Sequence, residues 1–460
     1  MNSIIVLAAA GIASMFVGVF KLKRLGLPLV ILSCLAALGI LMLNYNGDYS
    51  SLMNNMLVFD NFSFGFSCVM ILVTMGVLVI SKYYYRENIE HLSDIYALFI
   101  FSLIGGILLV SFQSLVMLFL GLEILSIPLY ILAASNRRNL FSNEAGLKYF
   151  LMGSFASCFL LLGITLIYGT TGSFDLDIIG EYVTANRSSL PGLFVAGCLL
   201  ILAAFAFKIS AVPFHFWAPD VYQGSPTVIT AFMATVVKTA AFGALIRFVD
   251  QTILLQSDIW QQMIIRTAIL TLVVGNFTAL FQTNLKRLLA YSGIANAGYV
   301  LIAVGTLQIN TTEYVLYYLT SYSIATILAF TIYSIIKEQT GIDSIEGLKG
   351  LFANNKLLTI TLAISMFSLA GIPPLAGFFG KYAIFANAVK AGNIYLVIIG
   401  VLSSLLGVYY YLRVMANAFQ TTPAIAQIKI YPGYRIILFA GILLLLALGV
   451  MPDIFTYLIS

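Results

Sequence analysis

Long apolar stretches alternate with short polar connections from one end of the chain to the other. A helix that crosses the hydrocarbon core of a bilayer needs about 20 apolar residues, and the chain contains about fourteen runs of that size. We expect membrane-spanning helices over residues 3–20, 27–45, 62–83, 93–111, 113–134, 143–169, 191–222, 226–249, 262–282, 287–307, 314–336, 356–390, 393–417 and 435–456. This pattern predicts an all-α, polytopic membrane protein.

Two of these runs are interrupted by proline. Pro213 and Pro219 lie inside the seventh run, and Pro373 and Pro374 lie inside the twelfth. Proline removes a backbone donor and breaks the helical hydrogen-bond ladder. At membrane depth the freed backbone groups must be satisfied by neighbouring helices or by water. We therefore expect the seventh and twelfth helices to be discontinuous.

The matching positions of the two breaks indicate an internal repeat. The fourth to eighth helices (93–250) form one five-helix unit, and the ninth to thirteenth (251–420) form a second. Because five is odd, the second unit is expected to be inverted, as in many transporters. The first three helices then occupy residues 1–92, and the last helix lies in residues 421–460. Two independent proline kinks are the alternative interpretation.

Charges are few and lie mostly between the apolar runs. Only 9% of the residues are charged, whereas a soluble domain has about 25%, so lipid must be the main solvent. The net charge of +5 forms no basic stripe, so we expect no nucleic-acid partner. With both termini on the outer side, the inner connections carry most of the positive charge, as the positive-inside rule requires. These inner residues are Lys21, Lys23, Arg24, Lys82, Arg86, Arg137, Arg138, Lys286, Arg287, Lys337, Lys349, Lys356, Lys429 and Arg435, against Arg187, Arg266 and Lys390 outside.

The sequence singles out four charged residues that lie near the middle of apolar runs or next to their proline breaks. They are Glu123, Lys208, Lys238 and Lys381. An ionised side chain at the bilayer centre costs at least ~2.5–3.5 kcal/mol, so each must face the protein interior, a partner or water. Burial disfavours the charged form of a lysine, whereas a nearby carboxylate favours it. Three lysines and one glutamate in four helices therefore favour a proton path, with Glu123 acting on Lys208, over a set of structural ion pairs.

A second group of residues gives a weaker signal. Glu144 and Lys148 lie one helical turn apart and are more typical of an i,i+4 pair at the membrane boundary than of a proton path. His215 follows Pro213 and either passes protons to the inner side or packs in a hydrogen-bonded position. Tyr322 either lines a hydrated passage or joins helices.

No redox or nucleotide chemistry is visible in the sequence. The four cysteines, Cys34, Cys68, Cys158 and Cys198, lie singly inside apolar runs and are typical of small buried hydrophobic side chains. There is no glycine-rich dinucleotide motif, no P-loop and no histidine pair placed for haem. We expect no cofactor on this chain, and any redox energy source must lie on another polypeptide.

Long motifs in the chain resemble the antiporter-like membrane subunits of respiratory complex I, the NADH–quinone oxidoreductase, and specifically the subunit N family. They are LGLEILSIPLYILA, EAGLKYFLMGSFASCFLLLGITLIYG, FKISAVPFHFWAPDVYQGSPTVITAF, VVKTAAF, NFTALFQTNLKRLLAYSGIANAGY and FSLAGIPPLAGFFGKYAIF, and they cover the fourth to fourteenth helices.

This resemblance implies fourteen helices, two inverted repeats and one proton channel. By motif position, Glu123 is the fifth-helix glutamate, and Lys208, Lys238 and Lys381 are the seventh-, eighth- and twelfth-helix lysines. The antiporter-like subunit M has a glutamate where this chain has Lys381. The family also usually reads AYSSIAHAGY where this chain reads AYSGIANAGY, so Asn296 replaces a titratable histidine.

The resemblance also implies the setting in which the chain works. It would be one subunit of an enzyme in the bacterial inner membrane, with subunits M, L, K and J as partners. FMN, iron–sulfur clusters, NADH and quinone would bind to other subunits. A subunit of an Mrp-type cation/proton antiporter or of a membrane-bound hydrogenase is the alternative, and a non-pumping spacer in a membrane arm is a third.

Overall fold

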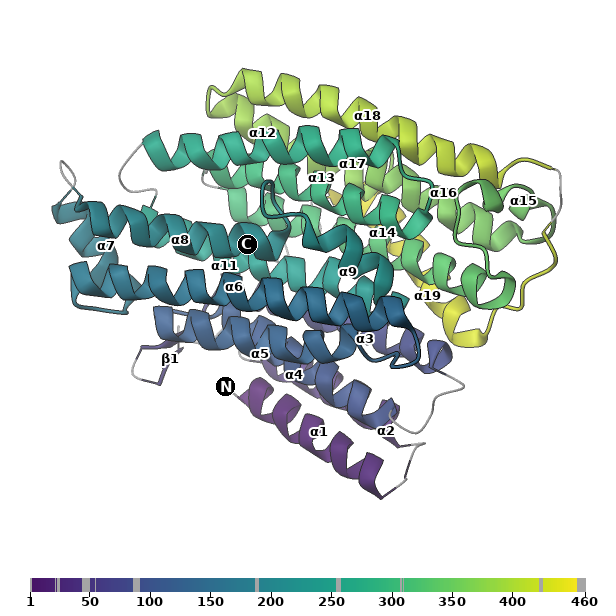
Figure 1. Cartoon of the computed structure of the whole chain (residues 1–460), viewed down its shortest axis with the longest axis horizontal. Helices are drawn as coiled ribbons and strands as arrows, with labels where there is room; N and C mark the ends of the chain where they lie inside the picture. Colours follow the sequence, from purple (N-terminus) through teal and green to yellow (C-terminus); the bar gives the residue numbers. More distant parts are fainter. Residues whose placement is uncertain are drawn as a thin grey trace. The chain divides into compact units, whose positions relative to one another are not determined.

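The structure, a computed structural model, is built almost entirely of helices (Figure 1). It describes residues 2–20, 22, 25–43, 50–53, 55–85, 92–186, 190–253, 258–306, 308, 310–421 and 425–452. The connection charges Lys21, Lys23, Arg24, Arg86 and Arg187 lie outside these residues.

Thirteen helices in the described part of the chain are long and apolar enough to cross a membrane. They are α1 (Asn2–Val19), α2 (Gly26–Leu43), α3 (Asn61–Tyr84), α4 (Leu92–Val110), α5 (Leu115–Ala133), α6 (Leu140–Thr171), α8 (Gly192–Ile209), the continuous helix Thr227–Thr252, α12 (Asp258–Leu280), α13 (Leu285–Thr306), α14 (Thr311–Thr340), α18 (Ile394–Ala418) and α19 (Pro432–Val450). The remaining predicted run, 356–390, forms α16 (Lys356–Ala370) and α17 (Ala376–Lys390), each of 15 residues. Such a helix is about 22 Å long, short of the ~30 Å hydrocarbon core. The predicted all-α membrane fold is confirmed.

The helices group into two compact units, of which the first contains Met1–Leu78, Tyr85–Ser210 and Val236–Met263. In this unit α5 packs against both α4 and α6 (Figure 1). Small residues lie where these helices approach one another most closely. A Cβ atom added at Gly105 on α4 would collide with the backbone of Leu125 on α5. One added at Gly163 on α6 would lie 2.7 Å from the carbonyl of Gly197 on α8. Small residues therefore allow the close helix contacts that membrane proteins use.

The second unit contains Val79–Tyr84, Ala211–Thr235 and Ile264–Ser460. Its most buried long helices are α13 and α14, and α14 packs against α16, α17 and α19. The Tyr317 hydroxyl on α14 donates to the carbonyl of Leu448 on α19 at 2.8 Å. Gly380 on α17 lies against the ring of Tyr318 on α14, and a Cβ atom added at Gly380 would lie 2.7 Å from Cδ2 of that ring.

Both predicted interruptions are present and have a similar form. The helix α8 ends at Ile209, and Ser210 follows with a left-handed φ of 63°. The helix α16 ends at Ala370, and Gly371 follows with a φ of 83°. A left-handed residue closes a helix by bonding back to its last carbonyl groups. Each helix is then continued by a second piece, α9 (Trp217–Gly224) after α8 and α17 after α16. The inverted relation of the repeats and the boundaries at 92, 250 and 420 stay predictions.

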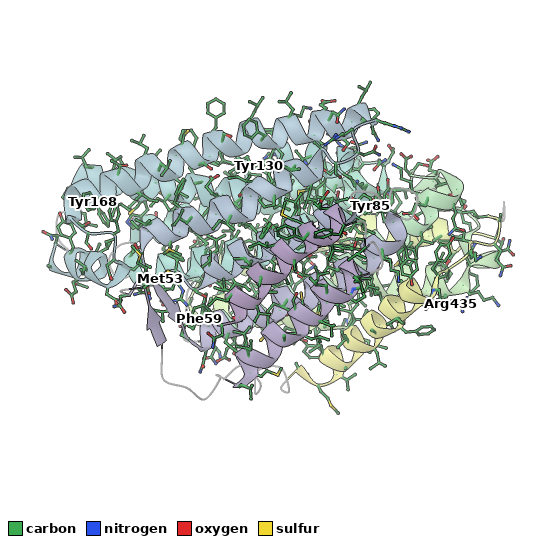
Figure 2. The ribbon with its side chains drawn as sticks, turned by 90° about the horizontal axis from the view of Figure 1, so that it is seen from below. Met53, Phe59, Tyr85, Tyr130, Tyr168 and Arg435 are labelled. Carbon is green, nitrogen blue, oxygen red and sulfur yellow. The ribbon has the colours of Figure 1, made fainter. Side chains whose placement is uncertain are left out.

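Several short elements were not anticipated. In the first unit, β1 (Ser50–Leu52) and β2 (Leu57–Phe59) form an antiparallel hairpin, on which Figure 2 labels Met53 and Phe59. The ten-residue helix α7 (Leu176–Ala185) is bridged to the start of α5 between Asp175 and Ser114. The helix Thr227–Thr252 contains α10 (Thr227–Phe232), α11 (Lys238–Phe248) and two π-helical turns, η2 (Met233–Val237) and η3 (Val249–Ile253). The second unit also contains η4 (Glu346–Leu348) and α15 (Leu351–Asn354).

Candidate functional site

Lys208 lies in the last turn of α8, and side chains from α5 and α6 hold its ammonium group. Its Nζ donates to Ser126 Oγ on α5 at 2.6 Å and to Tyr149 Oη on α6 at 3.2 Å. The same Nζ lies 5.4 Å from the centre of the Tyr149 ring. The side chain is only 3% exposed. Two hydroxyl groups and an aromatic face therefore replace water around this charge.

Glu123 lies one turn before Ser126 on α5 and is coupled to Lys208 through charge. Its Oε1 accepts a short hydrogen bond from Ser157 Oγ on α6, and its carboxylate interacts electrostatically with Lys208. The contacts of these two described residues include no direct ion pair within 4 Å. The predicted pairing is thus a longer-range coupling, with Ser126 bonded to the lysine and Ser157 to the carboxylate. Glu123 is half-buried in this chain.

The spacing of α5 and α6 explains why these groups meet. Glu123, Ser126 and Tyr130 are separated by three and four residues, so they lie on one face of α5. Tyr130, labelled in Figure 2, packs edge-on against Tyr149 with ring centres 4.9 Å apart. Its hydroxyl bonds to Ser126. Gly153 on α6 leaves room for this ring, because an added Cβ would collide with the Tyr130 hydroxyl.

Lys238 lies in the same unit at the first residue of α11, directly after the π-helical turn η2. Its side chain is 2% exposed, and α11 packs against α4 and α8. A π-helical turn adds one residue to a helical turn and is common at functional positions. Here it sets the direction in which the side chains of Lys238 and of the residues after it project from the helix.

Lys381 lies in the second unit, on the first turns of α17. Its Nζ donates to the backbone carbonyls of Leu369 at 2.9 Å and Ala370 at 3.0 Å, the last two residues of α16. It also lies 4.6 Å from the centre of the Tyr299 ring on α13. The last carbonyl groups of a helix have no partner within the helix and carry partial negative charge. Lys381 therefore caps the half-helix that precedes it.

Asn296 is fully engaged with its neighbours in the second unit. Its Oδ1 accepts from the Tyr318 hydroxyl at 2.6 Å, and its Nδ2 donates to the Ser292 carbonyl at 2.9 Å and to the Tyr411 hydroxyl at 3.4 Å. Tyr322, on the same helix as Tyr318, is buried and bonds to Thr326. The position that the family usually gives to histidine is thus occupied by an amide between two tyrosines.

The weaker candidates Glu144, Lys148 and His215 lie in different environments. Glu144 and Lys148 form the predicted i,i+4 ion pair on α6, with oxygen and nitrogen 2.7 Å apart, and both side chains are largely exposed. His215 lies in the connection between α8 and α9, where it is buried and packs against Phe216, with ring centres 4.3 Å apart and the ring planes tilted by 34°.

Comparisons with known proteins decide the family. The family model described as "NADH:quinone oxidoreductase/Mrp antiporter, TM" matches residues 112–407. A NADH-quinone oxidoreductase subunit N from Cytophaga hutchinsonii is 42% identical over 461 residues, which cover 99% of this chain and 98% of that protein. The chain belongs to the subunit N family of NADH-quinone oxidoreductase.

Two solved structures resemble this member of the subunit N family. A chain of respiratory complex I from Thermus thermophilus, solved with bound aureothin, is 34% identical with a TM-score of 0.83, over 98% of this chain and 97% of that one. A chain of the Mrp complex from Dietzia sp. has a TM-score of 0.88 over 98% of this chain and 94% of that one, but only 19% identity. The likeness to the Mrp complex therefore concerns the fold alone, and the family is that of the NADH-quinone oxidoreductase subunit.

The structure of this subunit N family member also corrects the number of buried charges, which the sequence put at four. Lys286 at the start of α13 was assigned to a connection, but it is 3% exposed and donates to the carbonyls of Ser225 and Gln223 at the end of α9. Arg247 on α11 is also buried, and its Nη2 donates to both carboxylate oxygens of Asp60 at 2.7 and 2.8 Å. Each cation lies near a helix end in sequence, so hydropathy alone could not distinguish it from a connection charge.

Over the residues that the structure describes, no group of three or more His, Cys, Asp and Glu side chains is placed to hold a metal ion. The described cysteines are unpaired, with Cys34 and Cys198 buried and Cys158 exposed.

Proposed function

We propose that this chain is a proton-translocating membrane-arm subunit of a bacterial NADH–quinone oxidoreductase, and that Glu123, Lys208, Lys238 and Lys381 carry the protons. The observation that carries the proposal is the Lys208 site, where a buried ammonium group bonds to two hydroxyls and is coupled to a half-buried carboxylate. Membership of the subunit N family supports it.

The Lys208 site can accommodate both protonation states of the amine. A hydroxyl group rotates, so Ser126 and Tyr149 can accept from an ammonium or donate to a neutral amine. The ammonium is favoured while the Glu123 carboxylate is charged and close. Protonation or displacement of Glu123 removes this stabilisation, and Lys208 then releases its proton. Glu123 thereby acts as the switch, and Ser157 holds it in place through its hydroxyl.

Lys238 and Lys381 would continue the path in the two units. The helix that carries Lys238 packs against the helix that carries Lys208. Lys381 is stabilised as a cation by the carbonyl end of α16, which is how interrupted membrane helices bind cations. His215, Tyr322, Glu144 and Lys148 are proposed to have secondary roles in proton entry or exit.

The proposed setting follows from the same family. The chain is a multi-pass membrane protein, and we place it in the bacterial inner membrane with both termini on the periplasmic side. Its proposed partners are other membrane-arm subunits, specifically the antiporter-like M and L and the small K and J. FMN, the iron–sulfur clusters, NADH and quinone are proposed to bind elsewhere in the complex.

The test is Lys208→Ala in the assembled complex, measured as NADH-driven proton uptake by inside-out membrane vesicles. We expect the number of protons moved per NADH oxidised to fall, while the complex still assembles. The matched control is Lys390→Ala, because Lys390 is an exposed lysine at the end of α17. A normal ratio in Lys208→Ala would refute the assignment, and an equal loss in the Lys390 control would show that the effect is not specific.

A further inference from the structure

The two lysines beside the helix breaks are stabilised by different kinds of group. Lys208 is coupled to the carboxylate of Glu123. In the part of the chain that the structure describes, no carboxylate is in ion-pair contact with Lys381. Its ammonium contacts two backbone carbonyls and the face of the Tyr299 ring, at 4.6 Å from the ring centre.

The Tyr299 ring is fixed in position by a buried polar network. Its hydroxyl bonds to Asn276 on α12 and to Ser404 on α18. Asn276 is itself held, because its Oδ1 accepts from the Tyr410 hydroxyl at 3.0 Å and its Nδ2 donates to the Leu272 carbonyl at 3.0 Å. Tyr299, Asn276 and Tyr410 are all buried. The ring also packs edge-on against Phe385, with ring centres 6.1 Å apart. Contacts from three neighbouring helices therefore determine which face of the ring meets Lys381.

An aromatic face attracts a cation through the negative charge on its π surface, and the attraction is larger where water is excluded. An aromatic ring has no charge of its own, so it stabilises the ammonium without becoming a proton acceptor. Tyr299 can thus hold a proton on Lys381 without competing for it.

We propose that Tyr299 is a positioning residue for proton transfer at Lys381, whose ring takes the stabilising role that the Glu123 carboxylate has at Lys208, and that Asn276 fixes the ring. This proposal rests on the proposed function, since it assumes that Lys381 carries protons. Loss of the aromatic face would lower the proton-binding constant of Lys381 by about 2- to 30-fold, which is the range set by cation–π energies.

The decisive experiment replaces residue 299 in the whole complex with Phe, with ring-fluorinated phenylalanines introduced by nonsense suppression, and with Leu. Tyr299→Phe keeps the aromatic face but removes the bonds of the hydroxyl to Asn276 and Ser404. Each added fluorine weakens the π surface while the ring keeps nearly the same size. We expect Tyr299→Phe to retain most of the protons moved per NADH, the fluorinated series to decline stepwise, and Tyr299→Leu to show the largest loss. A flat fluorinated series, or a loss in Tyr299→Phe equal to that in Tyr299→Leu, would overturn the proposal.

Two further variants separate this idea from structural damage and from the proposed function. Asn276→Leu should lower pumping less than Tyr299→Leu, because the ring is kept but not fixed. Tyr409→Leu is the matched control, since Tyr409 adjoins Tyr410 on α18 but is 61% exposed, and its pumping should equal that of the unmodified complex. If Lys381→Ala itself pumps normally, the proposed role of Lys381 fails; if only the Tyr299 series is without effect, the role of the ring fails alone.

Discussion

Replacing Ser126 with alanine removes one of the two hydroxyl groups to which the Lys208 ammonium donates. The bond is short, with Nζ and Oγ 2.6 Å apart, and it lies in the buried core of the first unit. A hydrogen bond to a charged group contributes about 1.5–3 kcal/mol. Tyr149 remains at 3.2 Å but cannot make two bonds in place of one. The charged form of Lys208 therefore loses up to about 1.5–3 kcal/mol relative to the neutral form, or up to about 10- to 150-fold in proton binding.

Ser126→Ala should also change the pH dependence of proton uptake. The mutation weakens the protonated state more than the neutral amine, because a hydrogen bond to a charged group is stronger than one between neutral groups. NADH-driven proton uptake by inside-out vesicles should therefore fall first at the alkaline end of its pH profile and recover on acidification. The alkaline limb should move by up to about one to two pH units, at 1.36 kcal/mol per unit.

A matched control and a clear refutation are available. The Ser154 hydroxyl on α6 donates to the Phe150 carbonyl of its own helix at 2.8 Å, so Ser154→Ala should leave the profile unchanged. If Ser126→Ala has the same profile as the unmodified complex while assembling normally, Ser126 does not stabilise the proton on Lys208.

Two further substitutions test the structure around the site. Arg247→Met should lower the temperature at which the solubilised protein unfolds, because it leaves Asp60 without its cation. The loss of stability should be below the ~3–5 kcal/mol of an unpaired, fully buried charge, since the Asp60 side chain is 21% exposed. Adding Asp60→Asn should restore part of that stability, and no recovery would argue against the pair as the cause. Gly371→Ala should lower proton uptake for two reasons. A residue with a side chain is destabilised by about 1–2 kcal/mol at the left-handed φ of 83° that Gly371 adopts. The new Cβ would also lie 2.9 Å from Lys381 Cδ. A vesicle measurement with normal uptake would show that Lys381 adjusts without loss.

The membrane spans could be predicted because each depends on a local property of the chain. A run of about twenty apolar residues can be recognised without knowing what it packs against. Proline interrupts the helical hydrogen-bond ladder wherever the helix lies, as at Pro213, Pro373 and Pro374. The break at Ile209 and the one at Ala370 were therefore correctly expected. Short α7 was missed because ten residues are too few for a hydropathy pattern. The turn η2 was missed because a π-helical turn changes the register of a helix without any composition signal.

The candidate site was predictable only in part, for a related reason. An ionised residue inside an apolar run is visible at once, which is how Lys208, Lys238 and Lys381 were found. The partners of these lysines are serine, tyrosine and backbone carbonyls from other helices, and such residues are common throughout the chain. Tyr299, Ser126 and Asn276 carry no sequence signal that distinguishes them from packing residues. Only the tertiary contacts identify them.

The contrast between Lys208 and Lys381 has a consequence for how a proton path of this kind can be switched. At Lys208 the stabilising charge belongs to a side chain, Glu123, which is half-buried on α5 and can be neutralised by protonation. At Lys381 the stabilising groups are the carbonyl end of α16 and a ring held by three helices. Neither is an anion that protonation could neutralise, and neither can turn without moving a helix. In the proposed mechanism Lys381 therefore keeps a constant local field, and its proton is released when charge arrives from elsewhere along the path. Glu123→Gln should then abolish the control of proton release from Lys208 by a carboxylate. No single carboxylate substitution among the described residues should have the corresponding effect on proton release from Lys381.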